Sequence, residues 1–143
     1  MKKIILLLLA ATFLLITVTP VNALSKRSQA KQLEISLFKY ASAIRWNEFE
    51  IASNYIDPEH LEKNPPTDFE KERLRQIQVT GYQAKTQDTL PDGTVEQTVE
   101  IRLINRNTQA DRSVLDVQIW RWDQKAKRWW LTTGLPDFTA KSF

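Results

Sequence analysis

The stretch of sequence that decides the fold runs from Val95 to Trp122 and reads VEQTVEIRLINRNTQADRSVLDVQIWRW. Its first half alternates apolar and polar side chains, and its second half does the same after the polar turn Asn105–Asp111. A period of two is typical of half-buried β-strands, because successive side chains in a strand point to opposite faces. Two such strands joined by a short polar turn predict an antiparallel pair at the centre of the fold.

The sequence on both sides of this pair continues the same pattern. Upstream, a strand is expected at 76–87 with Gly81 as a bulge, and the segment Leu90–Gly93 (LPDG) forms the turn that follows it. Downstream, Lys125–Lys127 turns the chain into a last strand, Arg128–Thr133. We therefore predict a four-stranded antiparallel meander.

The residues before the strands have the spacing of helices. One apolar face repeats every three or four positions, at Leu33, Leu37, Tyr40, Ala41 and Ile44. Asn47, with Glu50 three residues later, is expected to cap a second short helix that ends before Pro58. Helical turns are expected at 59–63 and 68–74. Helices followed by strands indicate an α+β fold, with N-terminal helices packed on a curved four-stranded antiparallel meander sheet.

The beginning of the chain predicts export. Lys2 and Lys3 precede an apolar run, and small residues lead to a cleavage site after Ala23, so residues 1–23 are expected to be a signal peptide. The alternative is an uncleaved anchor. After cleavage we expect no stable membrane anchor, and the protein is then periplasmic in a Gram-negative organism and otherwise secreted. The expected mature chain has a flexible arm at 24–32, one cone-like domain at 33–138 and a C-terminal tail at 139–143.

Composition excludes several classes of function. The chain has 143 residues, 20 Lys and Arg against 17 Asp and Glu, and no cysteine. Without Lys2 and Lys3 the balance is 18 to 17, a net charge of +1, so we expect no nucleic-acid partner. The absence of cysteine rules out disulfides and thiolate ligands. The acidic stretch 57–72 lacks glycine and closely alternating ligands, so neither a metal site nor a cofactor is expected.

Three segments carry a resemblance to a known family. They are YASAIRWNEFE at 40–50, YIDP at 55–58 and WWLTTGLP at 129–136. Together with the order of helix, short helix, loop and four strands, they resemble exported bacterial members of the nuclear transport factor two-like (cystatin-like cone) superfamily over roughly Ala30–Phe138. The resemblance implies a cone-shaped fold and, as in many members, a homodimer formed through the sheet. It implies no single function, because this fold hosts enzymes, binding proteins and scaffolds.

The interior of the expected cone is predicted to be dry. Strand positions assigned to the inner face carry only aliphatic side chains: Val99, Ile101, Leu103, Leu115, Val117 and Ile119. Tyr40 and Tyr55 form a possible pocket, but no base accompanies their phenol groups. Asp116 has the opposite parity, and His60, the only histidine, is expected at the surface. General acid–base chemistry needs a titratable group inside a pocket, so no catalytic residue is assigned.

The opposite parity of the third strand predicts a surface for a partner or ligand. Trp120 and Trp122 are two residues apart and therefore point to the same face, and Trp130 on the next strand is expected to join them. Gln118 and Arg121 complete this predicted surface. Tryptophan is enriched at the centre of protein interfaces. The alternative is that these rings only cover the second face of the sheet beneath the C-terminal tail.

The predicted function is therefore that of an exported, non-catalytic binding or assembly module. It engages a small apolar ligand, or a protein partner through the sheet, and that partner is a second copy of the chain or another envelope protein. The alternative is a small-molecule enzyme of the isomerase or hydratase type, with a pocket inside the cone. Ionisable groups meeting in such a pocket would favour the enzyme, whereas a dry cone with exposed Trp120 and Trp122 would favour binding.

Overall fold

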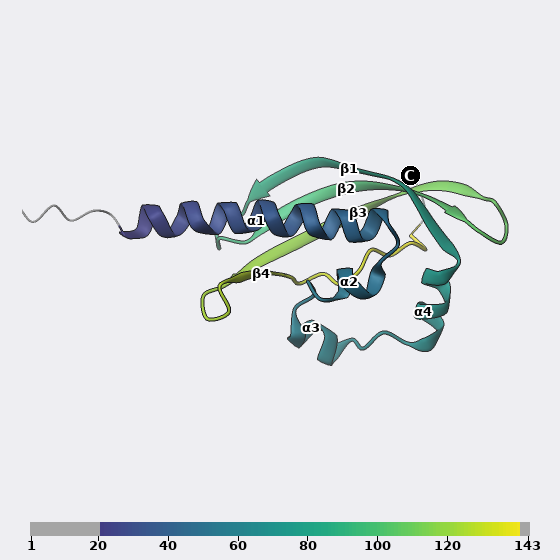
Figure 1. Cartoon of the computed structure of the whole chain (residues 1–143), viewed down its shortest axis with the longest axis horizontal. Helices are drawn as coiled ribbons and strands as arrows, with labels where there is room; N and C mark the ends of the chain where they lie inside the picture. The colour runs from purple at the N-terminus through teal and green to yellow at the C-terminus, as the bar shows by residue number, and fades with distance from the viewer. Residues whose placement is uncertain (1–20, 141–143) are drawn as a thin grey trace, which may run out of the picture.

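The computed structural model describes residues 21–140, in which four helices precede four strands (Figure 1). The helices are α1 Val21–Arg45, α2 Phe49–Ser53, α3 Pro58–Lys63 and α4 Asp68–Arg75. The strands are β1 Ile77–Thr89, β2 Val95–Asn105, β3 Asp111–Asp123 and β4 Arg128–Leu131. The α+β class, with helices before a four-stranded antiparallel sheet, is confirmed.

The sheet is an open, curled meander in the order β1-β2-β3-β4, with every neighbouring pair antiparallel (Figure 1). The expected bulge at Gly81 is present, because the β1–β2 register shifts between Val79 and Gly81, and a second shift lies between Ala84 and Thr86. β4 is short and pairs only with the last residues of β3. Most of β3 therefore has a neighbour on one side only.

α1 covers the inner face of the sheet and is longer than its apolar pattern suggests. Its residues Leu33, Tyr40 and Ile44 are buried in the core. The segment 24–32, expected to be a flexible arm, belongs to this helix. One reason is a contact far along the chain: the indole N–H of Trp129 donates to the carbonyl oxygen of Gln29 at 2.9 Å. This tertiary contact holds the first turns of α1 near β4.

The break between α1 and α2 differs from the expectation that Asn47 caps α2. The N-cap of α2 is Glu48, which makes no side-chain capping bond. Asn47 instead has a φ of 60°, the left-handed conformation that ends helices and that asparagine tolerates better than most residues. Its side-chain oxygen accepts a hydrogen bond from the backbone N–H of Val79 at 2.8 Å. Asn47 thus ends α1 and joins it to β1.

The two faces of β3 are the reverse of those predicted. The β2–β3 register places Val99 opposite Asp116 and Val95 opposite Trp120, so these side chains share the inner face. Leu115 and Val117, expected inside, are 56% and 48% exposed on the outer face. Each parity of β3 contains apolar residues, and the tryptophan parity is buried because a large ring fills more of the core than a valine or leucine does.

The ends of the chain lie largely outside the described residues. The expected signal peptide spans 1–23, of which 1–20 are not described, and the expected tail at 139–143 is described only to residue 140. Among the helices of residues 21–140, none combines the length and the apolarity needed to cross a membrane.

Candidate functional site

The residues of the predicted tryptophan surface do not form one surface. Trp120 is fully buried and packs edge-on against the rings of Tyr40 and Tyr55, with centroid distances of 5.4 and 6.4 Å. Gln118 is fully buried as well and accepts a hydrogen bond from the indole N–H of Trp120 at 3.2 Å. The expectation that these side chains are exposed is wrong, because the helices cover the face of the sheet on which they lie.

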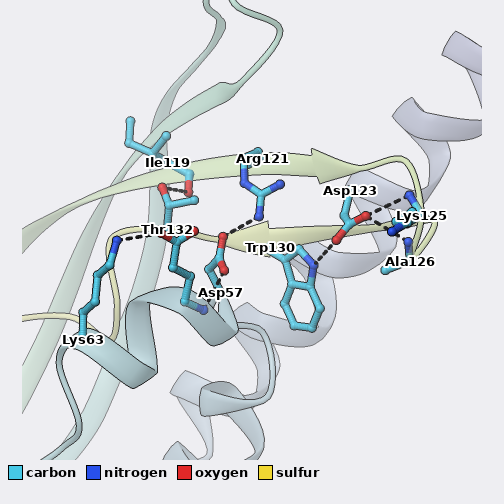
Figure 2. Close-up of polar contacts among 10 residues, drawn as sticks. Asp57, Lys63, Ile119, Arg121, Asp123, Lys125, Ala126, Trp130 and Thr132 are labelled. Atoms are coloured by element: carbon cyan, nitrogen blue, oxygen red, sulfur yellow. Dashed lines mark hydrogen bonds and ion pairs between the residues drawn. The ribbon is translucent and has the colours of Figure 1, made fainter.

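The other three members of that surface lie on two sides of the sheet. Trp122 is half-buried on the inner face, where its ring contacts Trp129 at a centroid distance of 5.7 Å. Trp130 and Arg121 are paired across β3 and β4 and share the outer face. There the Trp130 indole donates to Asp123 at 3.2 Å, as Figure 2 shows. Trp130 and Arg121, both predicted to belong to the partner surface, are therefore hydrogen-bonded to residues of their own chain.

Arg121 has a structural role that links distant segments. Its guanidinium donates to the carboxylate of Asp57 at 2.5 Å (Figure 2). The same carboxylate caps α3 by accepting from the backbone N–H of Glu59 at 3.0 Å. Burial alone would raise the pKa of Asp57, but these two hydrogen bonds outweigh it and hold the pKa below its usual value. The ion pair therefore fixes the start of α3 against β3.

One concave site is the space between α3, α4 and the end of the sheet, which we call the α3–α4 cleft. It has a volume of about 850 Å³. In Figure 1, α4 lies below the end of the sheet where β1 begins, and α3 lies below α2. Two caps position these short helices: Asp57 at α3, and a capping box at α4 in which Thr67 and Glu70 bond each other's backbone N–H.

The α3–α4 cleft is lined by apolar and polar side chains in about equal measure. The apolar side chains come from α3, α4, the sheet and the C-terminal segment: Ile56, Leu61, Leu74, Ile77, Leu103, Leu135 and Phe138. Four charged side chains line it as well: Glu70, Arg73, Arg112 and Asp137. Two cations and two anions cancel, so the cleft has no net charge that would select an ion. Sites for small molecules are usually more apolar than this cleft, so its uncharged polar side chains, such as Asn64, Asn105 and Thr133, would take part in holding a ligand.

His60 lies in this cleft and not, as expected, on the open surface. It is half-buried and packs beneath Gly134, where an added Cβ would come within 2.8 Å of the His60 Nε2 atom. Gly134 also has a φ of +79°, a conformation that side chains other than glycine rarely adopt. The segment after β4 therefore requires glycine here, and the close approach seats His60 against one wall of the cleft.

The inner face is not dry, because a polar cluster lies between α1 and the sheet. The side-chain amide of Gln118 donates to Asp116 at 2.8 Å and to the Tyr82 hydroxyl at 3.0 Å. Burial raises the pKa of Asp116 to about 6, against a smaller lowering by the Gln118 hydrogen bond. Burial also raises the pKa of Tyr82 to about 12. The prediction that Asp116 faces away from the core is therefore wrong.

Tyr40 and Tyr55, the predicted pocket residues, belong to the core and not to the α3–α4 cleft. Tyr40 is fully buried, and its ring contacts that of Tyr55 at 6.1 Å. Burial, and next the negative charge of Asp116, raise the pKa of Tyr40 well above its usual value. Within residues 21–140, the Tyr40 hydroxyl has no hydrogen-bond partner. The Tyr40 hydroxyl therefore holds its proton more tightly than a free tyrosine does.

A second concave site is a groove of about 830 Å³ between α1 and β1. Phe38 and Trp46 line it and are 76% and 73% exposed. Arg45 crosses it, donates to the carbonyl oxygen of Tyr82 at 2.9 Å and lies over the Tyr82 ring. The groove is lined by α1, β1 and one residue of β2, whereas the α3–α4 cleft draws on two helices, the sheet and the C-terminal segment. We therefore treat the cleft as the candidate site.

The described part of the chain contains no group of three His, Asp or Glu side chains placed to hold a metal ion. Comparison with protein-family models, with curated proteins and with solved structures gave no match. The resemblance to the nuclear transport factor two-like superfamily consequently stays a prediction, and the case for function comes from the geometry of this chain.

Sequence reasoning missed most residues of the cleft. Its charged side chains come from α4, from β3 and from the segment after β4, more than 60 positions apart in sequence between Glu70 and Asp137. No motif joins such distant positions. The one local signal was the turn around Gly134 and Pro136, which indicates a chain that folds back at the end of the last strand.

Proposed function

We propose that the protein is an exported, non-catalytic binding module that holds a small, largely apolar and uncharged ligand in the α3–α4 cleft. The observation that carries the proposal is the cleft itself: about 850 Å³, walls of mixed apolar and polar side chains, and charged groups that balance. Sites for small molecules usually measure about 300–1,000 Å³ and use a few polar groups to orient a mostly apolar ligand. Burial of apolar surface would supply most of the binding free energy.

The polar groups on the rim would orient the ligand. Arg112 donates to the carbonyl oxygen of Phe138, which holds the C-terminal segment across the cleft. Glu70 is engaged in the capping box of α4. Since these groups already have partners in the chain, a ligand with a formal charge would have to displace one of them. A neutral molecule with hydrogen-bonding groups at one end fits the rim better.

Binding of a neutral fluorescent probe tests this proposal. N-phenyl-1-naphthylamine gains fluorescence in an apolar site, and we expect the full chain, expressed in a host that exports it, to bind the probe in the micromolar range. Leu74→Trp fills the cleft from α4, because Leu74 is a half-buried lining residue, and should weaken binding at least tenfold.

The matched control is Leu90→Trp. Leu90 is half-buried too, but it lies in the β1–β2 turn, at the other end of the hairpin from the cleft. This variant should bind the probe as the unmodified chain does. Circular dichroism checks that both variants are folded. Absence of probe binding to the unmodified chain, or equal loss in both variants, contradicts the proposal.

A second candidate function is an enzyme of the isomerase or hydratase type, favoured by one observation. Asp116 has a pKa raised to about 6, and the Gln118 amide donates to both Asp116 and the Tyr82 hydroxyl, so a candidate general base lies near a phenol. Asp116 does not line the α3–α4 cleft, so we rank this candidate second. Incubating the exported protein in D₂O with any small molecule that co-purifies with it separates the two. Deuterium entering carbon positions, and lost in Asp116→Asn, would support the enzyme.

A further inference from the structure

The side of α1 that points away from the sheet carries apolar rings and cations together. Side chains three, four, seven or eight positions apart share one side of a helix. On the side opposite the buried Leu33, Tyr40 and Ile44, this spacing gives a set that we call the α1 outer face: Arg27, Lys31, Ile35, Phe38, Arg45 and Trp46. Trp46 follows the last residue of α1, but its N–H still donates to the carbonyl oxygen of Ser42 at 3.0 Å and so continues the helical path.

The apolar members of the α1 outer face are open to solvent. Phe38 and Trp46 are 76% and 73% exposed, more than any other large apolar side chain of residues 21–140, and Ile35 is 37% exposed. The two rings are eight residues apart, about 12 Å along the helix. Exposed apolar groups that gather on one surface mark a place where a soluble domain meets a partner or a membrane.

The charge of the domain is divided unequally, and α1 is its basic part. The helix carries five Lys and Arg and a single acid, Glu34. Residues 46–143 carry 13 Lys and Arg against 16 Asp and Glu. Within residues 21–140, none of the four lysine and arginine side chains in Lys26–Lys39 forms an ion pair. The positive charge of α1 is therefore available to an external anion.

We propose that the α1 outer face docks the protein on an anionic phospholipid bilayer. The helix lies flat on the surface, Phe38 and Trp46 enter the boundary between headgroups and acyl chains, and the cations contact the phosphates. Helices with basic residues beside Trp and Phe bind membrane surfaces in this way. The attachment is peripheral and reversible. It is separate from the proposed ligand site, because no residue of the α1 outer face lines the α3–α4 cleft.

The shape of this face favours a lipid surface over a protein partner. Its six residues extend over about 28 Å of helix. In Figure 1, α1 is one straight rod whose first turns extend beyond the strands. A bilayer accepts rings at any position along such a ridge, whereas a protein partner would need a pocket matched to each ring. Tryptophan also prefers the lipid interface, because its ring is apolar and its N–H is polar.

The sequence before α1 also leads to a membrane. Ile4–Val18 is apolar apart from two threonines and is the predicted export signal. The docking proposal rests on the proposed export at this one point: α1 is then the part of the domain that emerges next to the lipid surface. Its cations meet the phosphates there first.

Vesicle flotation tests the proposal with the full chain purified from a host that exports it. The protein should float with vesicles of phosphatidylglycerol and phosphatidylcholine in equal parts, and it should not float with vesicles of phosphatidylcholine alone. Raising the salt from about 0.1 M to about 0.5 M should weaken binding at least tenfold, because ions screen exposed charges.

Two double variants separate the contribution of the rings from that of the charges. Phe38→Ser with Trp46→Ser removes both rings, and Arg27→Glu with Lys31→Glu reverses two charges. Each double variant should weaken binding to the anionic vesicles at least tenfold, because rings and cations both contribute to binding at a lipid surface.

Matched controls carry the same changes on α3 and α4. Phe69→Ser removes a ring that is 69% exposed, as open as those of the α1 outer face. Lys63→Glu with Lys71→Glu makes the same change in net charge as the reversal on α1. Both controls should bind the vesicles as the unmodified chain does, and circular dichroism checks that every variant is folded.

Brominated acyl chains show which part of the protein reaches the lipid, because bromine quenches tryptophan fluorescence only at short range. Trp46 is the only exposed tryptophan of the five. With enough brominated anionic vesicles to bind all of the protein, the unmodified chain should be quenched, and Trp46→Phe should lose most of that quenching.

Four results would overturn the proposal. The unmodified chain fails to bind anionic vesicles, or it binds pure phosphatidylcholine equally well, as an inserted apolar segment would. A control loses as much binding as its matched variant, or the variant without rings binds normally, since any polyanion would then satisfy the cations. Quenching that persists in Trp46→Phe would show that another surface meets the lipid. The vesicle assay contains no naphthylamine probe and the cleft assay contains no vesicles, so failure of either proposal is seen separately.

Discussion

At the scale of single residues, Tyr40 carries a hydroxyl group that the fold buries without giving it a partner. Its ring packs against Trp120 and Tyr55, and its hydroxyl has no hydrogen-bond partner within residues 21–140. A buried polar group without a partner costs about 1–3 kcal/mol. Tyr40→Phe keeps the ring contacts and removes the hydroxyl, so we expect the free energy of unfolding to rise by about 1 kcal/mol. Urea denaturation measures it.

The control for this prediction is Tyr55→Phe, since Tyr55 is only half-buried and its hydroxyl can reach solvent. This variant should change the free energy of unfolding by less than about 0.5 kcal/mol. If Tyr40→Phe is destabilised instead, the Tyr40 hydroxyl has a partner in solution, such as a buried water or a ligand that reaches the polar cluster.

At the scale of elements, Asn47 determines how α1 joins the sheet. It adopts a φ of 60° and bonds the Val79 N–H, so both its backbone and its side chain contribute. Asn47→Gly keeps the backbone conformation and loses the bond, and we expect a loss of about 1 kcal/mol in the free energy of unfolding. Asn47→Ala adds backbone strain, for a loss of about 2 kcal/mol or more. Thermal or urea unfolding of both variants shows whether Asn47→Ala is less stable than Asn47→Gly, as expected.

Hydrogen exchange distinguishes this role from that of a helix cap. If Asn47 joins α1 to β1, both variants should speed exchange at Val79 and leave α2 nearly unchanged. Faster exchange confined to α2, with Val79 unchanged, would show that Asn47 caps α2 after all.

At the scale of the whole molecule, two carboxylates whose pKa values are shifted in opposite directions make stability depend on pH. The pKa of Asp57 is lowered in the folded chain, so its stabilising contribution is lost as pH falls below about 3.8. The pKa of Asp116 is raised to about 6 from an ordinary 3.8, so its contribution is present below 3.8 and is lost as pH rises through about 6. Stability should therefore be greatest between about pH 4 and 5, and unfolding from pH 3 to 8 tests this.

Two variants show which carboxylate causes the change in stability on each side of the maximum. Asp116→Asn should abolish the decrease between pH 4 and 7, which we expect to be about 2 kcal/mol once partial exposure to solvent is allowed for. Asp57→Asn should leave that decrease in place and lower stability at neutral pH, because Arg121 loses its charged partner. A profile that rises steadily to pH 7, and that Asp116→Asn does not change, would contradict the assignment.

The sequence by itself determined the elements and their order. Alternation at Val95–Asn105, the turn at Leu90–Gly93 and the helical spacing from Leu33 to Ile44 are local properties, so the α+β class and the meander followed from them. These patterns suffice because hydrogen bonding and side-chain direction repeat with a fixed period within each element. They also placed Gly81 at a bulge, which the strand register confirms.

Only the tertiary structure decided which face of β3 is buried and where the cleft lies. Both parities of β3 carry apolar side chains, and the choice depended on Trp120 packing against Tyr40, a residue 80 positions earlier in the chain. Asp116 and Gln118 are polar but lie on the same inner face as Trp120, because alternate residues of a strand always share one face of the sheet. The cleft is assembled from short capped helices and a returning C-terminal segment. Such contacts between distant residues leave no period in the sequence, since three-dimensional packing alone selects them.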